Sequence, residues 1–484
     1  MKKILSTILF CAILISSCAC GNGSSADDTT APQTSGDTTS APEETEEAEK
    51  LDLPDDLNYG GYVFRIRSRP SPRVEEVLAE EENGDNLNDA VYRRNIMVED
   101  KLGIKFEVIQ SSDDAWDPDA LNTVLAGEDA YDAIACYARA SFDFAAKGAV
   151  HNLYDIENLD LTKSWWSQSA AESLTINGKL YSIVGDISHA TLSSSVGMVF
   201  NKELFDDYQL KYPYELVDSG EWTFDVFDSY ARKFSQDLNG DGEMNIKDDL
   251  FGYGSNHWLG PIEALYCTGN RIITTNDEGY PELTLYSEKV VDMYDKYMSL
   301  ILSECGWNQL AGTDHQEAFC EGRVAMVDLG LAHLSRDYFR DATIEFGLVP
   351  WPKSDESVDK YYSFVDAGQT MWTIPVTNQD TARTGAVLET MAYYGQKMII
   401  PAYYDVTLQN KYLRDERSVD MLDYIREGAI FDLGYYNNTQ FGGNLANPGY
   451  DLVHNTKLTF TTLYNKNEQS VKTLIDKSMK SYLE

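Results

Sequence analysis

The sequence predicts an α/β fold in which a mostly parallel sheet is divided between two lobes. Stretches with the twofold alternation of a strand are followed by stretches with helical spacing, the order expected where helices connect parallel strands. The chain has 484 residues, of which 43% are hydrophobic. A chain of this length exceeds what one hydrophobic core usually organises, so two lobes or domains are expected.

The folded body begins near Asn58 with a strand, a helix and a second strand. In YVFRIRS, which starts at residue 62, apolar and charged side chains alternate. Apolar side chains then recur at helical spacing from Leu87 to Leu102, and Gly103 is a suitable residue to end that helix. IKFEV alternates again, and a further helix leads into the strand YDAIAC.

The second half of the chain keeps the same alternation. GRVAMVDLG and IEFGLVPWP predict strands, and Thr381 to Lys397 predicts a helix. Ser418 to Glu484 predicts helices joined by loops, and we find no internal repeat.

The first residues predict export and a lipid anchor. Lys2 and Lys3 precede an apolar stretch, residues 4–15, that is too short to span a bilayer. The ISSC sequence that ends at Cys18 resembles the lipobox of bacterial lipoproteins, in which the signal is cut before the cysteine and the thiol carries the lipid. The alternative is an ordinary secretory signal with a chance cysteine.

Residues 1–17 are therefore expected to be a lipoprotein signal peptide, and residues 18–57 a lipidated cysteine followed by a disordered acidic tether. From Gly21 to Lys50 the chain is mainly Ser, Thr, Gly, Pro, Asp and Glu, which cannot offset the entropy of ordering. No other segment has 18 uninterrupted apolar residues. The body is expected outside the cytoplasm.

Charge and missing motifs exclude several functions. Asp and Glu number 79 against 39 Lys and Arg, a net charge of −40 that argues against nucleic-acid partners. The chain has no G-x-S-x-G, no H-E-x-x-H and no phosphate loop, which argues against an enzyme, although a pair of carboxylates for glycoside hydrolysis would leave no such motif. The body's four cysteines form no C-x-x-C and are expected to be free and buried: Cys136, Cys267, Cys305 and Cys320. The alternative is disulfide pairing, which four cysteines allow in three ways.

The segment DLNGDGEMNIKDD predicts a structural Ca²⁺ site. Side-chain oxygens fall at positions one, three, five, nine and twelve of the loop, with Gly242 at the sharp turn and a backbone carbonyl at position seven. Position twelve has an aspartate where the usual pattern has a glutamate. The following LFGYGSN is unsuited to a second helix, so the loop is expected to stabilise one lobe rather than to switch. The predicted ligands are Asp237, Asn239, Asp241, Glu243, Asn245 and Asp248.

Together these features resemble a family 1 extracellular solute-binding protein of an ABC importer. The resemblance is carried, in order, by AAKGAVHNLYDI, INGKLYSI with VGMVFNKELF, GEWTFDVFDSYARKF, EAFCEGRVAMVDLG, FGLVPWPK and IIPAYYDVTLQNKYLRDE. It implies a periplasmic-binding-protein-like fold of the class II type, with the ligand between two lobes joined by hinge crossings. By similarity, lobe one comprises residues 58–186 and 369–397, and lobe two comprises residues 187–368 and 398–484.

The resemblance also assigns ligand contacts, mostly where strands end and helices begin. Aromatic faces flanked by Asp, Asn and Arg suit a carbohydrate, because a ring covers the C–H face of a sugar and the polar groups bind its hydroxyls. Leu331 stands where many sugar binders have a tryptophan, a departure from the sugar-binding pattern. The predicted contacts are Arg69, Tyr137, Arg139, Trp166, Asp186, His189, Asn256, Trp258, Asp328, His333 and Asp366.

Some of these residues also have structural interpretations. His189 is equally compatible with an ordinary loop histidine, and Asp366 with a cap at the hinge. Trp222 is expected in the core. Of the adjacent Trp165 and Trp166, one is expected to face outward, because neighbours on an extended segment point to opposite sides.

The expected function is capture of a small solute, a carbohydrate or oligosaccharide, by hinge closure and its delivery to ABC permease subunits. The protein is expected to be a monomer, held by its lipid at the extracellular face of the cytoplasmic membrane of a Gram-positive-type bacterium. The alternatives are a surface lipoprotein that binds glycan without transport and a binder of a non-sugar solute.

Overall fold

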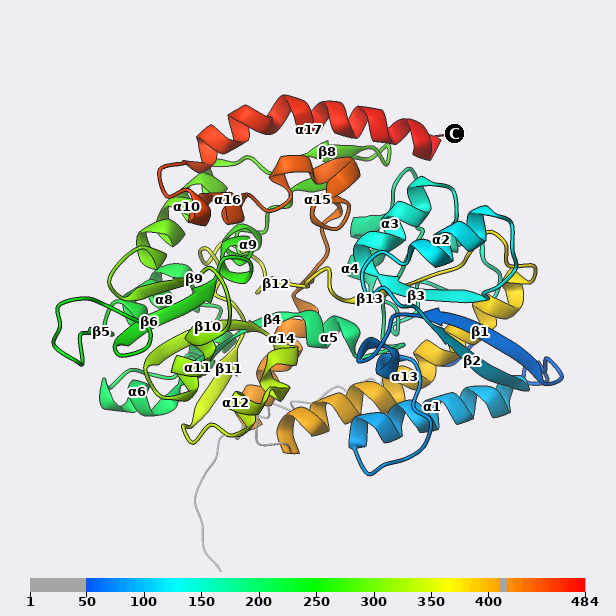
Figure 1. The fold of residues 1–484 in the computed structure, drawn as a ribbon, viewed down its shortest axis with the longest axis horizontal. Helices are drawn as coiled ribbons and strands as arrows, with labels where there is room; N and C mark the ends of the chain where they lie inside the picture. Colours follow the sequence, from blue (N-terminus) through cyan, green and yellow to red (C-terminus); the bar gives the residue numbers. More distant parts are fainter. Residues whose placement is uncertain (1–48, 410–415, 484) are drawn as a thin grey trace, which may run out of the picture. The chain divides into compact units, whose positions relative to one another are not determined.

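The computed structural model describes residues 49–409 and 416–483, and two β-sheets dominate them (Figure 1). The smaller sheet, the centre of lobe one, contains β1 (Tyr62–Ser68), β2 (Ile104–Gln110), β3 (Ala133–Tyr137) and β13 (Thr370–Thr373). Its order is β13-β3-β1-β2. β1 runs parallel to β2 and to β3, whereas β13 runs antiparallel to β3.

Lobe two is built on the larger sheet, whose order is β11-β4-β10-β6-β5, with β9 paired to β6. β6 is parallel to β10 and β9, but β4 is antiparallel to both β10 and β11. A mostly parallel sheet is therefore confirmed in lobe one and wrong in lobe two, where β4 enters the sheet directly from a crossing between the lobes. The strands are β4 (Val196–Asn201), β5 (Ser235–Gln236), β6 (Leu250–Asn256), β9 (Gly306–Gln309), β10 (Val324–Gly330) and β11 (Phe346–Val349).

Helix α1 (Asn86–Leu102) forms where the apolar spacing predicts it. The Asp85 carboxylate accepts hydrogen bonds from the backbone N–H groups of Leu87 and Asn88, which caps the first turn. Gly103 ends the helix with φ 61°, a left-handed conformation that glycine adopts readily.

Helices cover both faces of the lobe one sheet (Figure 1). α1 and α13 (Thr381–Gln409) pack together along one face, and α2 (Pro118–Leu125) and α3 (Ala138–Ala146) lie on the other. The helix predicted over Thr381 to Lys397 begins as predicted but continues through Pro401. A proline removes only one backbone hydrogen bond, and the buried side chains of Ile399 and Ile400 hold the helix there. The predicted lobe boundary at residues 397 and 398 thus falls inside a continuous helix.

The remaining helices belong mainly to lobe two and to the C-terminal segment. They are α4 (Gln168–Leu174), α5 (Ala190–Ser194), α6 (Lys202–Asp207), α7 (Tyr214–Asp218), α8 (Phe224–Ala231), α9 (Leu259–Tyr266), α10 (Glu288–Ile301), α11 (Asp314–Cys320), α12 (Asp337–Arg340), α14 (Glu416–Glu427), α15 (Leu433–Tyr436), α16 (Pro448–His454) and α17 (Phe460–Leu483). Short elements complete the fold: η1 (Arg73–Glu76), η2 (Leu153–Asp155), η3 (Leu331–Ser335), η4 (Asn438–Gly442), η5 (Gly443–Leu445), β7 (Ile273–Thr275) and β8 (Pro281–Leu283). Within the described part of the chain, no helix has the length and apolar character needed to cross a membrane.

The crossings between the lobes are tied to one another. α5 leads from lobe one into β4, and β12 (Ser363–Phe364) leads back toward β13. The backbone N–H of Asp366 donates to the carbonyl of Ser194 at 2.9 Å, which joins these two crossings. β14 (Ala429–Ile430), which follows α14, pairs in parallel with β12. This two-residue strand is the part of the tail that the sequence did not predict.

Tryptophans fill the core of both lobes. Trp222 is fully buried as predicted. The prediction that Trp165 or Trp166 faces outward is wrong: both are buried, and their indole N–H groups donate to the two carboxylate oxygens of Glu389 at 3.1 and 2.8 Å. The backbone turns at this point, with the N–H of Trp166 bonded to the carbonyl of Lys163, so strand alternation does not apply. Cys136, Cys267, Cys305 and Cys320 are free and buried, as predicted.

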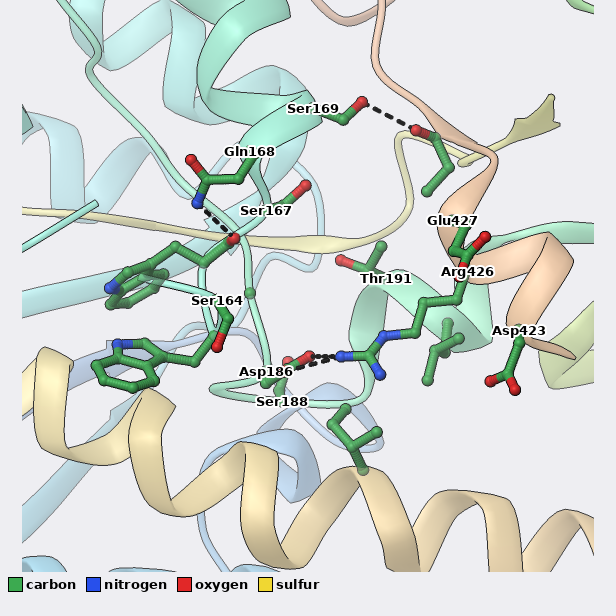
Figure 2. Close-up of a pocket in the computed structure, with 16 residues that line it drawn as sticks. Ser164, Ser167, Gln168, Ser169, Asp186, Ser188, Thr191, Asp423, Arg426 and Glu427 are labelled. Atoms are coloured by element: carbon green, nitrogen blue, oxygen red, sulfur yellow. Dashed lines mark hydrogen bonds and ion pairs between the residues drawn. The ribbon is translucent and has the colours of Figure 1, made fainter. Parts of the chain in front are cut away.

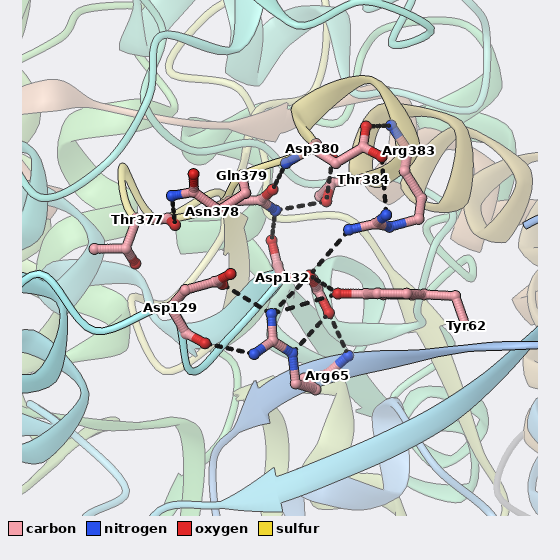
Figure 3. A network of polar contacts seen from close by, with 10 residues as sticks. All are labelled: Tyr62, Arg65, Asp129, Asp132, Thr377, Asn378, Gln379, Asp380, Arg383 and Thr384. Atoms are coloured by element: carbon pink, nitrogen blue, oxygen red, sulfur yellow. Dashed lines mark hydrogen bonds and ion pairs between the residues drawn. The ribbon is translucent and has the colours of Figure 1, made fainter.

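A polar network fastens the start of β1 to the start of α13 (Figure 3). Asp132, whose side chain is 1% exposed, accepts hydrogen bonds from the Tyr62 hydroxyl at 2.9 Å and from the backbone N–H of Arg65 at 2.7 Å. The Arg65 guanidinium pairs with Asp132 and with the exposed Asp129. The Arg383 guanidinium lies 3.5 Å from the centroid of the Tyr62 ring, so a single buried carboxylate organises this corner of lobe one.

Replacing Asp132 with alanine is expected to lower the free energy of unfolding by about 3 kcal/mol, because it leaves buried donors without an acceptor. Asp129→Ala removes the exposed partner of the same arginine, and is expected to cost at most about 1 kcal/mol. Urea unfolding of both variants measures the difference. Equal losses would contradict this role of Asp132.

Candidate functional site

Side chains at the ends of strands from both sheets meet between the lobes. Tyr137 ends β3 and Arg69 follows β1, both in lobe one, while Trp258 follows β6 in lobe two. The carboxyl ends of parallel strands are where ligands generally bind in open α/β sheets. We use the name interlobe cluster for Arg69, Tyr137, Arg139, Trp258, Asp366 and Tyr435.

Asp366 is the hub of the interlobe cluster. One carboxylate oxygen accepts a hydrogen bond from the Tyr435 hydroxyl at 3.0 Å and from the Trp258 indole at 3.3 Å. The other accepts from the backbone N–H of Gly368 at 2.7 Å. The Trp258 indole also donates to the Tyr435 hydroxyl at 3.0 Å. Asp366, which lies on the crossing between β12 and β13, thus holds Trp258 of lobe two and Tyr435 of the C-terminal segment.

Lobe one reaches this hub through two arginines. The guanidinium of Arg139 lies 4.9 Å from the centroid of the Tyr435 ring and 6.0 Å from that of Trp258. The guanidinium of Arg69 is 5.5 Å from the Tyr137 centroid, and it donates to Asp114 at 2.9 Å and to the carbonyl of Gly368 at 2.5 Å. Arg69 is 5% exposed, so it holds Tyr137 and the crossing in place rather than offering its charge to a ligand.

Two aromatic residues of this region were not predicted. Tyr435 is buried in the hub, and Trp116 is 44% exposed with its ring 6.1 Å from that of Tyr137. Burial raises the pKa of Tyr137, and burial, reinforced by the charge of Asp366, raises that of Tyr435, so both phenols stay neutral donors. Trp116 could have been predicted from the sequence, because it follows the end of β2 closely. The position of Tyr435 depends on packing and could not.

Asn256 and His333 lie close to the cluster in supporting positions. The Asn256 side-chain oxygen accepts from the backbone N–H groups of Trp258 and Leu259 at 2.8 and 2.7 Å, which orients Trp258. The ring nitrogens of His333 interact with Gln316 and Arg336. Burial and the charge of Arg336 lower the pKa of His333 to about 4, against an opposing effect of Asp366, so the imidazole is neutral at pH 7.

Asp328 does not contact this site, contrary to the prediction. Its side chain points into lobe two, where it is fully buried and accepts a hydrogen bond from the Ser255 hydroxyl at 3.0 Å. Burial raises the pKa of Asp328 to about 7. His189 lies apart from the hub: its ring stacks on Tyr403 at 5.4 Å, and burial lowers its pKa.

Trp166 and Asp186 line a separate cavity of about 430 Å³ at the hinge, which shares no lining residue with the interlobe cluster (Figure 2). Arg426 of α14 donates to both carboxylate oxygens of Asp186 at 2.8 Å, and Gln396 of α13 donates to one of them at 3.1 Å. Burial raises the pKa of Asp186, against the lowering effect of Arg426. This ion pair ties the end of lobe one to α14 of lobe two.

The predicted calcium loop is a series of turns held by its own side chains. Asp237 accepts from the backbone N–H groups of Gly240 and Gly242 at 2.6 and 2.8 Å. Asp249, rather than the predicted Asp248, turns back onto the loop and accepts from the N–H of Asn245 at 2.7 Å. Across residues 49–409 and 416–483, no three His, Cys, Asp or Glu side chains gather closely enough to hold a metal. The oxygen-rich donor set suits Ca²⁺, and calcium stays a prediction.

The burial of Asp328 predicts a distinct pH dependence. Because the folded protein keeps this proton up to about pH 7 and the unfolded chain releases it near pH 4, Asp328 makes the free energy of unfolding fall as pH rises through this interval and level off above it. The expected slope is on the order of 1 kcal/mol per pH unit. Asp328→Asn should lack this slope, whereas Asp341→Asn, at a side chain that is 75% exposed, should retain it. Identical slopes in urea unfolding from pH 4 to 8 would contradict the assignment.

Solved structures with a similar fold were found, although no protein-family model matches the chain and no curated protein is similar to it in sequence. A cyclo/maltodextrin-binding protein in complex with maltotetraose is 16% identical with a TM-score of 0.58, over 90% of this chain and 99% of that one. The apo form of RafE from Streptococcus pneumoniae is 15% identical with a TM-score of 0.55, over 86% and 99%.

UgpB from Mycobacterium tuberculosis, in complex with glycerophosphocholine, is 16% identical with a TM-score of 0.55, over 87% of this chain and all of the other. At these identities the likeness concerns the fold. The chain has the two-lobed fold of periplasmic-binding-protein-like solute-binding proteins, as the sequence predicts.

Proposed function

We propose that this protein is a family 1 solute-binding protein that captures a carbohydrate between its lobes for an ABC importer. The observation that carries the proposal is the interlobe cluster, in which Asp366 of a crossing holds Trp258 of lobe two within reach of Arg139 of lobe one. Similar structures hold maltotetraose or glycerophosphocholine, which supports a small polar ligand.

The cluster combines the two kinds of group that a sugar needs. The rings of Trp116, Tyr137 and Trp258 offer apolar faces for C–H groups, and the neighbouring guanidinium and carboxylate groups offer hydrogen bonds to hydroxyls. Because the rings come from both lobes, contacts with all three exist only when the lobes are close. Ligand binding would then shift the population toward the closed arrangement.

The hinge is suited to such a movement. Gly395 of α13 packs against the first crossing, where a Cβ atom would lie 2.0 Å from the carbonyl oxygen of Asp186. The side chain of Asp186 forms an ion pair with Arg426, which belongs to lobe two. Residues that contact both lobes at the crossings can act as a pivot while the sheets move as units.

We also propose that the mature chain begins at the lipid-bearing Cys18 and is held at the outer face of the cytoplasmic membrane. Cys18 lies outside the described residues, and the lipobox-like ISSC supports the anchor. The transport partner would be the ABC permease, and the net charge of −40 offers acidic surface for that contact.

Trp258→Ala is expected to weaken carbohydrate binding at least tenfold, because it removes an aromatic face and a hydrogen-bond donor to Asp366. Tyr286→Ala is the matched control, since Tyr286 is 43% exposed and contacts Phe460 and Tyr464 instead. Thermal unfolding of the chain from Glu49 with a panel of neutral and acidic oligosaccharides measures the effect. A ligand at a hundred times its Kd adds about 2.7 kcal/mol to the native state. No shift with any carbohydrate would refute the proposed function.

Calcium is proposed as a structural ion of the 237–248 loop. Adding a chelator is expected to lower the midpoint of thermal unfolding, because an ion bound only by the folded state stabilises it. Asp241→Asn should abolish the difference between calcium and chelator, and Asp277→Asn, outside the loop, should keep it. Titration of calcium into the apo protein with no heat of binding and no change in midpoint would exclude the site.

A further inference from the structure

Within residues 49–409 and 416–483, Arg139 forms no ion pair, although the chain has 79 acidic residues against 39 basic ones. It lies in the first turn of α3, directly after β3. Among the described residues, its buried Nε finds no hydrogen-bond partner, and no carboxylate forms an ion pair with its guanidinium. Its guanidinium lies 4.9 Å from the centroid of the Tyr435 ring and 6.0 Å from that of Trp258.

The other arginines of this region already have acidic partners. Arg69 pairs with Asp114 at 2.9 Å, and Arg73 pairs with Glu76 at 3.1 Å. The Asp366 carboxylate accepts hydrogen bonds from Gly368, Trp258 and Tyr435, all neutral donors, and it keeps its negative charge without an ion pair to Arg139. Arg139 is therefore the cation of the interlobe cluster that forms no direct ion pair with a described residue, and Asp366 is the acidic group that shares its aromatic neighbours.

A partly buried guanidinium without a counter-ion loses hydration and gains little in return. The two rings compensate only in part, because a cation over an aromatic face contributes on the order of 1 kcal/mol. The guanidinium lies 4.9 Å from the centroid of the Tyr435 ring, and the N–H groups of such a guanidinium can bind a carboxylate through two parallel hydrogen bonds. An anionic partner would compensate this guanidinium better than the rings do.

We infer that the ligand is an acidic carbohydrate whose carboxylate pairs with Arg139, the sugar ring lying against Trp258 and Tyr137. This inference rests on the proposed function and specifies its substrate class. A uronic acid residue fits, because it carries one carboxylate on a pyranose ring that an aromatic face can cover. Sulfated and phosphorylated sugars also carry negatively charged oxygen atoms. Binding measurements with each class of sugar distinguish them from uronates as ligands.

Calorimetry with uronate trimers and with the same trimers as methyl esters tests the inference, because the ester removes only the charge. The chain from Glu49 is used, since residues 49–484 form one compact unit. The panel contains trimers of galacturonate, glucuronate and mannuronate, a sulfated disaccharide, a sugar phosphate and maltotetraose. The acid is expected to bind at least tenfold more tightly than its ester, and its affinity to fall with added salt.

Arg139→Gln is expected to remove the preference for the acid, and Arg139→Lys to restore part of it. Arg93→Gln, at a side chain that is 61% exposed and paired with Glu82, is expected to keep the full preference. Thermal midpoints of the free variants verify that each is folded.

Three outcomes would overturn the inference: equal binding of acid and ester, an unchanged preference in folded Arg139→Gln, or binding of the sulfated or phosphorylated sugar alone. Tight binding of maltotetraose that depends on Trp258 would refute the acidic class and leave the proposed function standing. Failure of every carbohydrate would refute both.

Discussion

The carboxylate of Asp366 joins the two lobes and the C-terminal segment. It lies on a crossing between the lobes, its backbone N–H is bonded to the other crossing at Ser194, and its oxygens hold Trp258 and Tyr435. Without an acceptor here, the phenol would bury its donor at a net cost, and the indole would keep only the Tyr435 hydroxyl as an acceptor. The position of the aromatic groups between the lobes therefore depends on this one residue.

The C-terminal segment completes the arrangement that Asp366 begins. α15 supplies Tyr435, and the hydroxyl of the adjacent Tyr436 donates to the carbonyl of Val365 at 2.6 Å and accepts from Gln369 at 2.8 Å. Gln369 in turn accepts from Thr191 of α5 at 3.3 Å. These bonds connect the tail to both sides of the hinge, so the tail and the hinge form one structural unit. The hinge cavity beside Asp186 and Arg426 lies at the other end of the same crossing.

Local pattern was enough to predict β1, α1, β3 and β10, because each presents one apolar face with an unambiguous period. It was not enough for α13, whose continuation past Pro401 depends on packing against α1. The gathering of Arg69, Tyr137, Arg139, Trp258 and Asp366 follows the rule that ligand groups sit at strand ends. The same rule failed for Asp328. The rule predicts that a residue lies near the edge of the sheet, but it does not predict the face of the sheet on which the side chain lies. Tyr435 contacts Arg139 across almost three hundred positions of sequence, and no local signal encodes such a contact.

The claim that the lobes close on a carbohydrate is tested most directly by measuring the distance between them. Fluorophores at Glu128→Cys in lobe one and Glu203→Cys in lobe two label exposed positions, and the four native cysteines of the body are buried. Single-molecule energy transfer should show a second, more open population without sugar, and a shift toward the shorter distance as sugar saturates the site. A distance distribution that saturating sugar leaves unchanged would contradict closure between the lobes.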